Sequence, residues 1–247
     1  MPLHYFAKLS SPKRSAQNNL HLGCTLAAIA GALNAGGFLA IGRYTSHMTG
    51  IVSEAADDII LGKGWTVVTA LAMLSAFIAG SASTALLINY ARRNQMRLIY
   101  APVFCLESIL LLLFGLTGQH LQHHNLISIS LTAFLLCFVM GLQNALITKI
   151  SHAEIRTTHV TGLVTDIGIE LGKMLYWNRD HSQAAEHKVV SNRHKLKLHS
   201  CLVLAFFIGG IAGAFGFSRF GFLTSLPMAL CLVLISLAPY LSKSNQE

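Results

Sequence analysis

The chain has 247 residues, of which 11% are charged and 53% are hydrophobic. Soluble domains carry about 25% charged residues, so this composition excludes an ordinary soluble protein and indicates an integral membrane protein. The net charge of +8 does not call for a nucleic-acid partner, because basic residues beside membrane spans also attract anionic lipid headgroups.

Six apolar runs reach or approach the ~20 residues that an α-helix needs to cross about 30 Å of hydrocarbon. They cover residues 20–41, 65–88, 98–117, 126–148, 200–218 and 222–241. Outside them lie a polar N-terminal segment (1–19), a short loop (118–125), a basic loop or short surface helix (178–199) and a C-terminal tail (242–247). The sequence therefore predicts an all-α integral membrane fold with six transmembrane helices, the first being a retained anchor and not a cleaved signal peptide.

Basic residues are distributed unevenly between the two sides of the membrane. With the N-terminus in the cytoplasm, 15 of the 18 Lys and Arg residues fall on the inside and only Arg43, Lys63 and Arg219 on the outside. This positive-inside bias predicts a multi-pass protein of a bacterial inner membrane with both termini in the cytoplasm.

One motif occurs twice. T-S-H-M-T-G-I-V-S-E-A-A-D-D runs from Thr45, and T-T-H-V-T-G-L-V-T-D-I-G-I-E runs from Thr157. Upstream, G-A-L-N-A (residues 31–35) matches G-L-Q-N-A (141–145), and downstream F-I-A-G (77–80) matches F-I-G-G (207–210). Such self-similarity indicates an internal duplication into membrane repeats 20–117 and 126–241. Because each repeat holds three spans, we expect the two repeats to be inverted, as in many secondary transporters.

Each motif predicts a short helix, within residues 45–62 and 157–174. Ser46 or Thr49 in the first copy, and Thr158 or Thr161 in the second, are expected to cap the helix N-terminus. The acids fall four residues apart and share one helix face. Each helix is either re-entrant, with its N-terminus near the membrane midplane, or amphipathic at the interface; we favour the first, since a surface helix gives no reason to keep T-x-H-x-T-G twice.

The candidate solute-binding residues come from the motifs and from isolated polar positions inside the spans. They are His47, Thr49, Gly50, Glu54 and Asp58 in the first motif, His159, Thr161, Gly162, Asp166 and Glu170 in the second, and Asn34, Glu107 and Asn144 in the spans. An ionisable group within an apolar span is a functional candidate by default.

Structural roles compete with these assignments. The histidines could be part of a helix cap, and the motif acids could form a water-facing edge paired with Arg43 or Arg156. Asn34, Gln143 and Asn144 could form interhelical hydrogen bonds, and Glu107 could pair with a polar neighbour or stay protonated.

No cofactor and no metal are expected. The five cysteines lie singly within the spans and lack ligand spacing, so we interpret them as packing residues. His120, His123 and His124 give only a weak metal-binding signal, because no carboxylate or Cys accompanies them.

The stretches G-A-L-N-A-G-G-F-L-A-I-G-R-Y-T-S-H-M-T-G and M-G-L-Q-N-A-L-I-T-K-I-S-H-A-E-I-R-T-T-H-V-T-G resemble the YoaK family, also called DUF1275. The resemblance covers residues 20–241. It implies a bacterial inner-membrane protein whose activity is uncharacterised and for which transport has been suggested, and it supplies no catalytic residues.

The leading hypothesis is a small-solute transporter or channel with a pseudo-symmetric site at the repeat interface. The alternative is a non-transporting scaffold or regulator that binds a partner through residues 178–199. An intramembrane enzyme acting on lipid or quinone through Glu107 or the histidines is the least favoured, because no nucleophile pattern is present. The expected partners are the lipid bilayer and an unknown small solute, with no nucleic acid; a homo-oligomer is compatible with the sequence.

Overall fold

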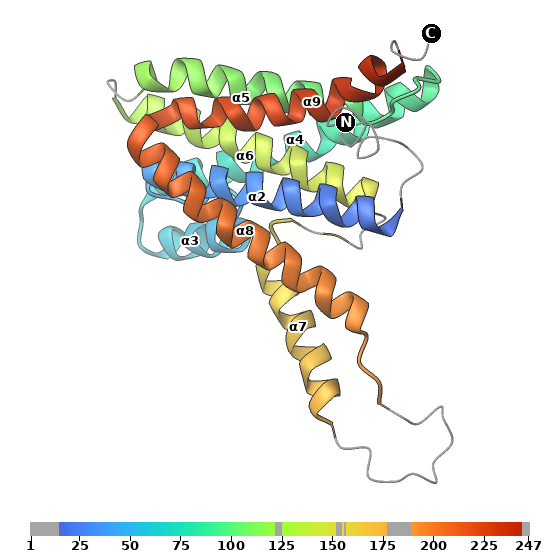
Figure 1. Cartoon of the computed structure of the whole chain (residues 1–247). Helices are drawn as coiled ribbons and strands as arrows, with labels where there is room; N and C mark the ends of the chain where they lie inside the picture. Colours follow the sequence, from blue (N-terminus) through green and yellow to red (C-terminus); the bar gives the residue numbers. More distant parts are fainter. Residues whose placement is uncertain (1–14, 122–124, 152–154, 156, 177–188, 244–247) are drawn as a thin grey trace.

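The protein is a helical bundle. The computed structural model describes residues 15–121, 125–151, 155, 157–176 and 189–243, and every regular element within them is helical (Figure 1). In chain order these are α2 (Ala16–Ile41), α3 (Met48–Ile60), α4 (Gly64–Arg93), α5 (Ala101–Leu121), α6 (Asn125–Ile150), α7 (Val160–Leu175), α8 (Arg193–Phe220), the short 3-10 helix η2 (Gly221–Thr224) and α9 (Ser225–Lys243). The all-α prediction is confirmed for this part of the chain.

Helices long and apolar enough to cross a membrane dominate the bundle. Within the described residues there are four such candidates, Gln17–Ile41, Gly64–Arg93, Leu131–Ile150 and Arg193–Ala238. The last combines α8, η2 and α9, and Ala101–Leu116 in α5 is a shorter apolar helix. These helices support a multi-pass membrane protein, and each of the six predicted spans overlaps a helix.

The helices pack in pairs that each join the two predicted repeats. α2 packs on α8, α4 on α6, and α5 on α9. The motif helices pack on the helix that follows them, α3 on α4 and α7 on α8. Neither repeat therefore forms a compact unit of its own.

Glycines allow two of these pairs to approach at backbone distance. A Cβ added to Gly31 of α2 would overlap the carbonyl oxygen of Phe206 in α8, and one added to Gly141 of α6 would overlap that of Phe77 in α4. The two close contacts are equivalent. They align Phe77 with Phe206, whereas the match of F-I-A-G with F-I-G-G aligned Phe77 with Phe207. Small residues at such crossings are the usual means by which membrane helices pack closely.

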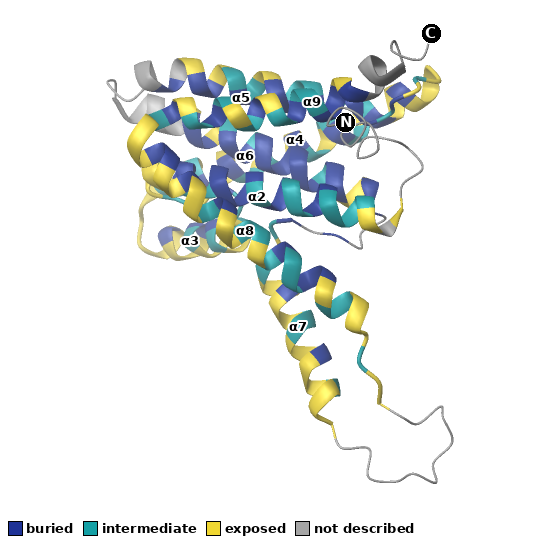
Figure 2. Cartoon of the chain, viewed as in Figure 1, coloured by how far each residue is buried: buried dark blue, intermediate teal, exposed yellow. Residues whose placement is uncertain are grey.

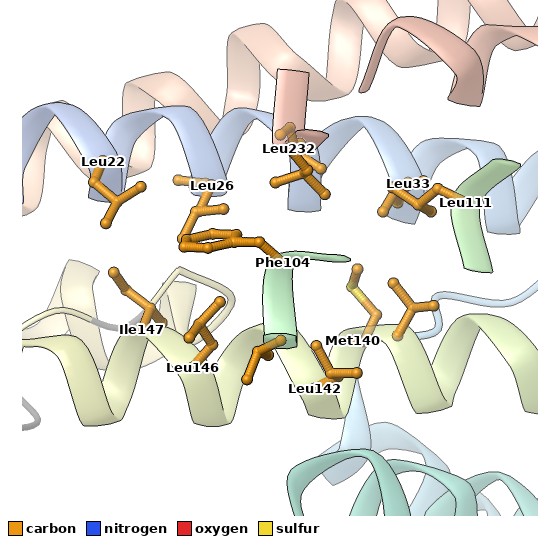
Figure 3. Close-up of a cluster of buried hydrophobic side chains, with 14 of the residues drawn as sticks. Leu22, Leu26, Leu33, Phe104, Leu111, Met140, Leu142, Leu146, Ile147 and Leu232 are labelled. Carbon is orange, nitrogen blue, oxygen red and sulfur yellow. The ribbon is translucent and has the colours of Figure 1, made fainter. Parts of the chain in front are cut away.

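The central core lies between α2 and α6, which run antiparallel. Figure 3 shows Leu22 opposite Ile147 and Leu33 opposite Met140. Phe104 of α5 reaches between the two helices, and all five side chains belong to one buried apolar cluster. Buried residues concentrate here, whereas the outer face of α8 carries many exposed residues (Figure 2), and α4 also has many exposed positions.

The α7–α8 hairpin, formed by α7 and the N-terminal part of α8, projects from the bundle (Figures 1 and 2). The predicted loop or short surface helix of residues 178–199 is helical at its C-terminal end, where residues 193–199 belong to α8. The Asn192 side chain accepts a hydrogen bond from the Lys195 backbone N–H at 3.0 Å and caps the helix there. Residues 177–188 of the predicted loop lie outside the described part.

Candidate functional site

The chain that follows α2 doubles back into the bundle. Gly42 ends the helix in the left-handed conformation, with φ of 71°. Both the backbone N–H and the hydroxyl of Ser46 then donate to the side-chain oxygen of Asn34, at 3.2 and 3.1 Å. Asn34 lies seven residues before the end of α2 at Ile41, which corresponds to about 10 Å along the helix. The first motif therefore begins inside the bundle and not at the end of α2.

The second motif is held in the same way. The Thr158 hydroxyl donates to the side-chain oxygen of Asn144 at 2.7 Å, and Asn144 lies six residues before the end of α6 at Ile150. The Ser151 hydroxyl accepts a hydrogen bond from the Ile155 N–H at 2.9 Å, which stabilises the intervening turn. Asn34 and Asn144 thus anchor two returning segments, and the prediction of interhelical hydrogen bonding is replaced by helix-to-turn bonding.

The two anchors lie at similar depths in the bundle. Asn34 directly follows Leu33, which lies opposite Met140 in Figure 3. Asn144 is four residues from Met140 along the antiparallel α6, so the levels of Asn34 and Asn144 differ by five residues, or about 7–8 Å along the helix axis. Both motif helices therefore start close to the middle of the α2–α6 core.

The first turns of α3 and α7 differ from the predicted caps. His47 and His159 are the N-cap residues, and neither makes a side-chain capping hydrogen bond. The prediction that Ser46, Thr49, Thr158 or Thr161 caps these helices is wrong, because the Ser46 and Thr158 hydroxyls bind asparagine and both N-termini lack a side-chain cap.

The remaining motif positions are open in the second copy and partly covered in the first. Thr49, Thr161 and Gly162 are exposed. The imidazole of His47 lies over Gly50, where a Cβ would overlap it, whereas a Cβ on Gly162 would meet nothing within 4 Å.

The first acid of each motif lies on the motif helix and forms an ion pair with a basic residue outside that helix. Glu54 lies 2.7 Å from Arg43, one of the two arginines named as alternative partners of the motif acids. Asp166 lies 3.1 Å from Lys195 and 3.5 Å from Nδ1 of His199, both on α8. The predicted alternative partner Arg156 lies outside the described residues.

The second acid of each motif is buried and contacts the start of the next long helix. Asp58 pairs with Lys63 at 3.5 Å, and Glu170 accepts the Asn192 backbone N–H at 2.6 Å and pairs with Lys173 at 3.0 Å. A hydrogen bond from Thr66 holds the pKa of Asp58 below its ordinary value, and the Asn192 N–H does the same for the pKa of Glu170. Because both side chains are less than 10% exposed, the predicted water-facing edge is wrong for Asp58 and Glu170.

Comparison with known proteins gives one match. The family model described as "Protein of unknown function (DUF1275)" matches residues 22–238. The chain belongs to the DUF1275 family. The resemblance to the YoaK family is consistent with this match. No curated protein and no solved structure matches the chain.

In this DUF1275 protein, two buried polar side chains of the motifs were not predicted as site residues, and a third, Gln143, was predicted only to form interhelical hydrogen bonds. Thr45 and Thr157, the first residues of the two motif copies, are fully buried, and neither hydroxyl has a hydrogen-bond partner among the described residues. Gln143 is also fully buried, and neither its oxygen nor its nitrogen has such a partner. The conserved spacing of the first threonine in both copies was the available signal for Thr45 and Thr157.

The site as a whole combines polar groups in the core with ion pairs away from it. Thr45 lies between α2 and α6, because its Cγ2 is 3.1 Å from the position of a Cβ on Gly37 and its carbonyl lies 3.4 Å from the Cys137 sulfur. Glu107 is buried in α5 with both oxygens unpartnered in the described part of the chain. Within that part no cluster of three His, Cys, Asp or Glu side chains could hold a metal; the side chains of His120, His123 and His124 lie outside it.

Proposed function

We propose that this DUF1275 protein is a small-solute transporter or channel of a bacterial inner membrane. In this proposal six spans form two inverted repeats with both termini in the cytoplasm, and the solute site lies where the returning segments enter the core. Transporters of this design bind their substrates at discontinuous helices near the membrane midplane.

One observation carries the proposal: two equivalent chain segments return into the bundle and start a helix there. The Asn34–Ser46 and Asn144–Thr158 hydrogen bonds hold these segments at similar depths. Irregular backbone at such a depth is stable in a membrane only where protein or a water-filled cavity surrounds it. A protein that served only as an anchor would have no need for two such segments.

The arrangement favours an anionic or neutral polar solute over a cation. The N-terminal ends of α3 and α7 carry partial positive charge and lack side-chain caps, so their backbone N–H groups are suited to bind oxygen atoms of a solute. A cation would have to compete for Glu54, Asp58, Asp166 and Glu170 with the basic side chains to which these four carboxylates are paired.

Unequal packing of the motif helices supports alternating access. Ile51 and Ala55 of α3 pack in one cluster with α4 and with Ala133 and Cys137 of α6. α7 packs mainly on α8 and projects with it away from the bundle (Figure 1). We propose that α3 and α7 exchange these two packing arrangements, packed against the bundle or projecting from it, during transport. The second site then opens to the cytoplasm while the first is closed.

Flux measurement in proteoliposomes tests the proposal. A panel of anionic, neutral and cationic solutes is compared for wild type, T45V and T157V, with H47A and H159A as further variants. We expect flux of at least one polar solute and a fall of about tenfold in T45V or T157V, since each loses a hydroxyl in the core. T69V is the matched control, because Thr69 lies on α4 and its hydroxyl bonds the Trp65 carbonyl at 3.0 Å. Absence of flux for every solute would count decisively against transport.

The projecting α7–α8 hairpin favours a second candidate function, that of a non-transporting scaffold or regulator. Arg193, His194 and Lys197 at the start of α8 are exposed, and their positive charge suits an acidic partner. If R193E/K197E abolished the protein's cellular effect while flux stayed absent in every form, the scaffold would replace the transporter.

A further inference from the structure

Glu107 is the only Asp or Glu within the six long helices α2, α4, α5, α6, α8 and α9. Its side chain is fully buried, and neither carboxyl oxygen has a hydrogen-bond partner in the described part of the chain. All four acids that the structure pairs with basic groups lie on α3 and α7. Glu107 therefore does not belong to the ion pairs that stabilise the motif helices.

The carboxyl group lies on the face of α5 that enters the central core. Residues three or four apart share a helix face, so Glu107 lies on the same face as Phe104 and Leu111. Figure 3 shows both of these side chains among those of α2 and α6, and both are fully buried. Glu107 is thus placed between two residues that line the α2–α6 core.

Gln143 approaches the same core from α6. It lies three residues from Met140 and four from Ile147, both of which face α2 in Figure 3. The opposite face of α6 carries Gly141, which contacts α4. In the first repeat the matching position is Leu33, so an apolar residue fills this place in the fold and packing alone does not call for an amide.

An unpaired carboxylate in this position is highly unfavourable, and a carboxyl group relieves the cost by taking up a proton. Among the described residues, no basic side chain lies on the buried faces of α2, α5, α6 or α9 at the level of Glu107. The ionisable groups in or against the core cluster are Tyr100, Cys24 and Cys231, while His21 lies near the start of α2 and Lys149 near the end of α6. None of these supplies a fixed positive charge beside Glu107.

We propose that Glu107 and Gln143 form a proton-binding site that couples proton movement to transport. A proton from the aqueous phase forms an O–H bond on the Glu107 carboxyl and returns to water as H⁺ when that bond breaks, with no electron transfer. The Gln143 amide makes no hydrogen bond to Glu107 in this structure; in the proposal it is the polar group that turns to the carboxylate when the proton leaves. This assignment rests on the proposed transport function for its coupling role, and it separates the proton site from the solute site at the returning segments.

Labelling with dicyclohexylcarbodiimide tests the site without any solute. This apolar reagent modifies protonated carboxyl groups within membranes, and mass spectrometry locates the adduct on purified, folded protein. We expect labelling of Glu107 near neutral pH that declines as the pH rises, and a loss of at least tenfold in E107Q. We expect Q143L to retain labelling to higher pH, because the charged form loses its polar neighbour. M140L, a change on the same face of α6, is the matched control and should follow wild type.

Two results would overturn the proposal. Either no labelling of Glu107 between about pH 5 and about pH 9, or labelling whose pH dependence is the same in Q143L as in wild type, removes the shared proton site. Thermal unfolding of E107Q and Q143L confirms that each variant is folded. Flux in proteoliposomes that persists without Glu107 labelling would refute the proton site alone, whereas labelling without any flux would refute the transport function alone.

Discussion

The Thr158 hydroxyl donates a 2.7 Å hydrogen bond to the side-chain oxygen of Asn144, fourteen residues earlier in the chain. Ser46 and Asn34 make the equivalent contact twelve residues apart. Each bond ties a returning segment to the interior of the helix that precedes it. The bond thus fixes the depth at which the motif helix begins.

Removing either partner should destabilise the returning segment. N144L leaves the Thr158 hydroxyl unpaired, and T158V removes that hydroxyl; each is expected to cost about 1–3 kcal/mol. Thermal unfolding in detergent measures the change. The double variant should lose less than the sum of the two single variants, as expected for groups in contact. Strict additivity would show that the two side chains do not interact.

The glycine crossings predict a sharp difference between neighbouring positions. G31A and G141A should each destabilise the protein by several kcal/mol, because the new methyl group must displace the backbone carbonyl of Phe206 or Phe77. G210A is the matched control, since the nearest atom to its Cβ lies 3.7 Å away, at ordinary contact distance. Equal unfolding temperatures for G31A and G210A would contradict the close approach of α2 and α8.

Disulfide trapping tests whether α3 and α7 exchange their packing arrangements. In the present state A55C should cross-link to native Cys137, because Ala55 and Cys137 share one buried cluster. The corresponding pair in the second repeat is I167C with A27C, which should cross-link only when α7 docks on α2. The four other cysteines, Cys24, Cys105, Cys201 and Cys231, are replaced in both backgrounds, and Cys137 in the second.

The two cross-links should exclude one another and each should stop flux. When all four cysteines of the two pairs are present in one molecule, a single cross-link per molecule is expected. Formation of both in the same molecule, or failure of the I167C–A27C pair under every condition, would refute the exchange while leaving the two returning segments intact.

The buried motif acids predict a loss of stability in acid. Asp58 and Glu170 have pKa values held below their ordinary values of 3.8 and 4.5 by hydrogen bonds from Thr66 and Asn192. Their contribution is complete above those ordinary values and is lost as the pH falls through the lower pKa of the folded state. Unfolding temperature measured from about pH 6 to about pH 3 should fall less steeply in E170Q than in wild type. Parallel curves would show that Glu170 does not stabilise the hairpin.

Part of the fold follows directly from local sequence. The span positions could be predicted because membrane helices need long apolar runs, and the motif helices because T-x-H-x-T-G precedes a helical pattern in both copies. Pairing of a motif acid with Arg43 was one of the alternatives open from the sequence, since Arg43 and Glu54 belong to the same short segment.

Contacts between distant segments could not be predicted in this way. Glu170 binds the N–H of Asn192, twenty-two residues away, and only the folded hairpin brings them together. Ser46 and Thr158 have the residue type of a helix cap, yet the nearby asparagines compete for their hydroxyls. Gln143 was predicted together with Asn144 to form interhelical hydrogen bonds, and only the folded structure shows that its amide has no partner among the described residues.

The crossing of Gly31 with Phe206 also constrains how the protein is made. A nascent chain that has reached only α5 contains Gly31 but not its partner in α8. The contact of α2 with α8 therefore forms only after the ribosome has synthesised most of the second half, and the contact of α4 with α6 at Gly141 likewise waits until α6 has been made. The order of the contacts thus makes final packing of the first three long helices a late event in the biogenesis of this protein.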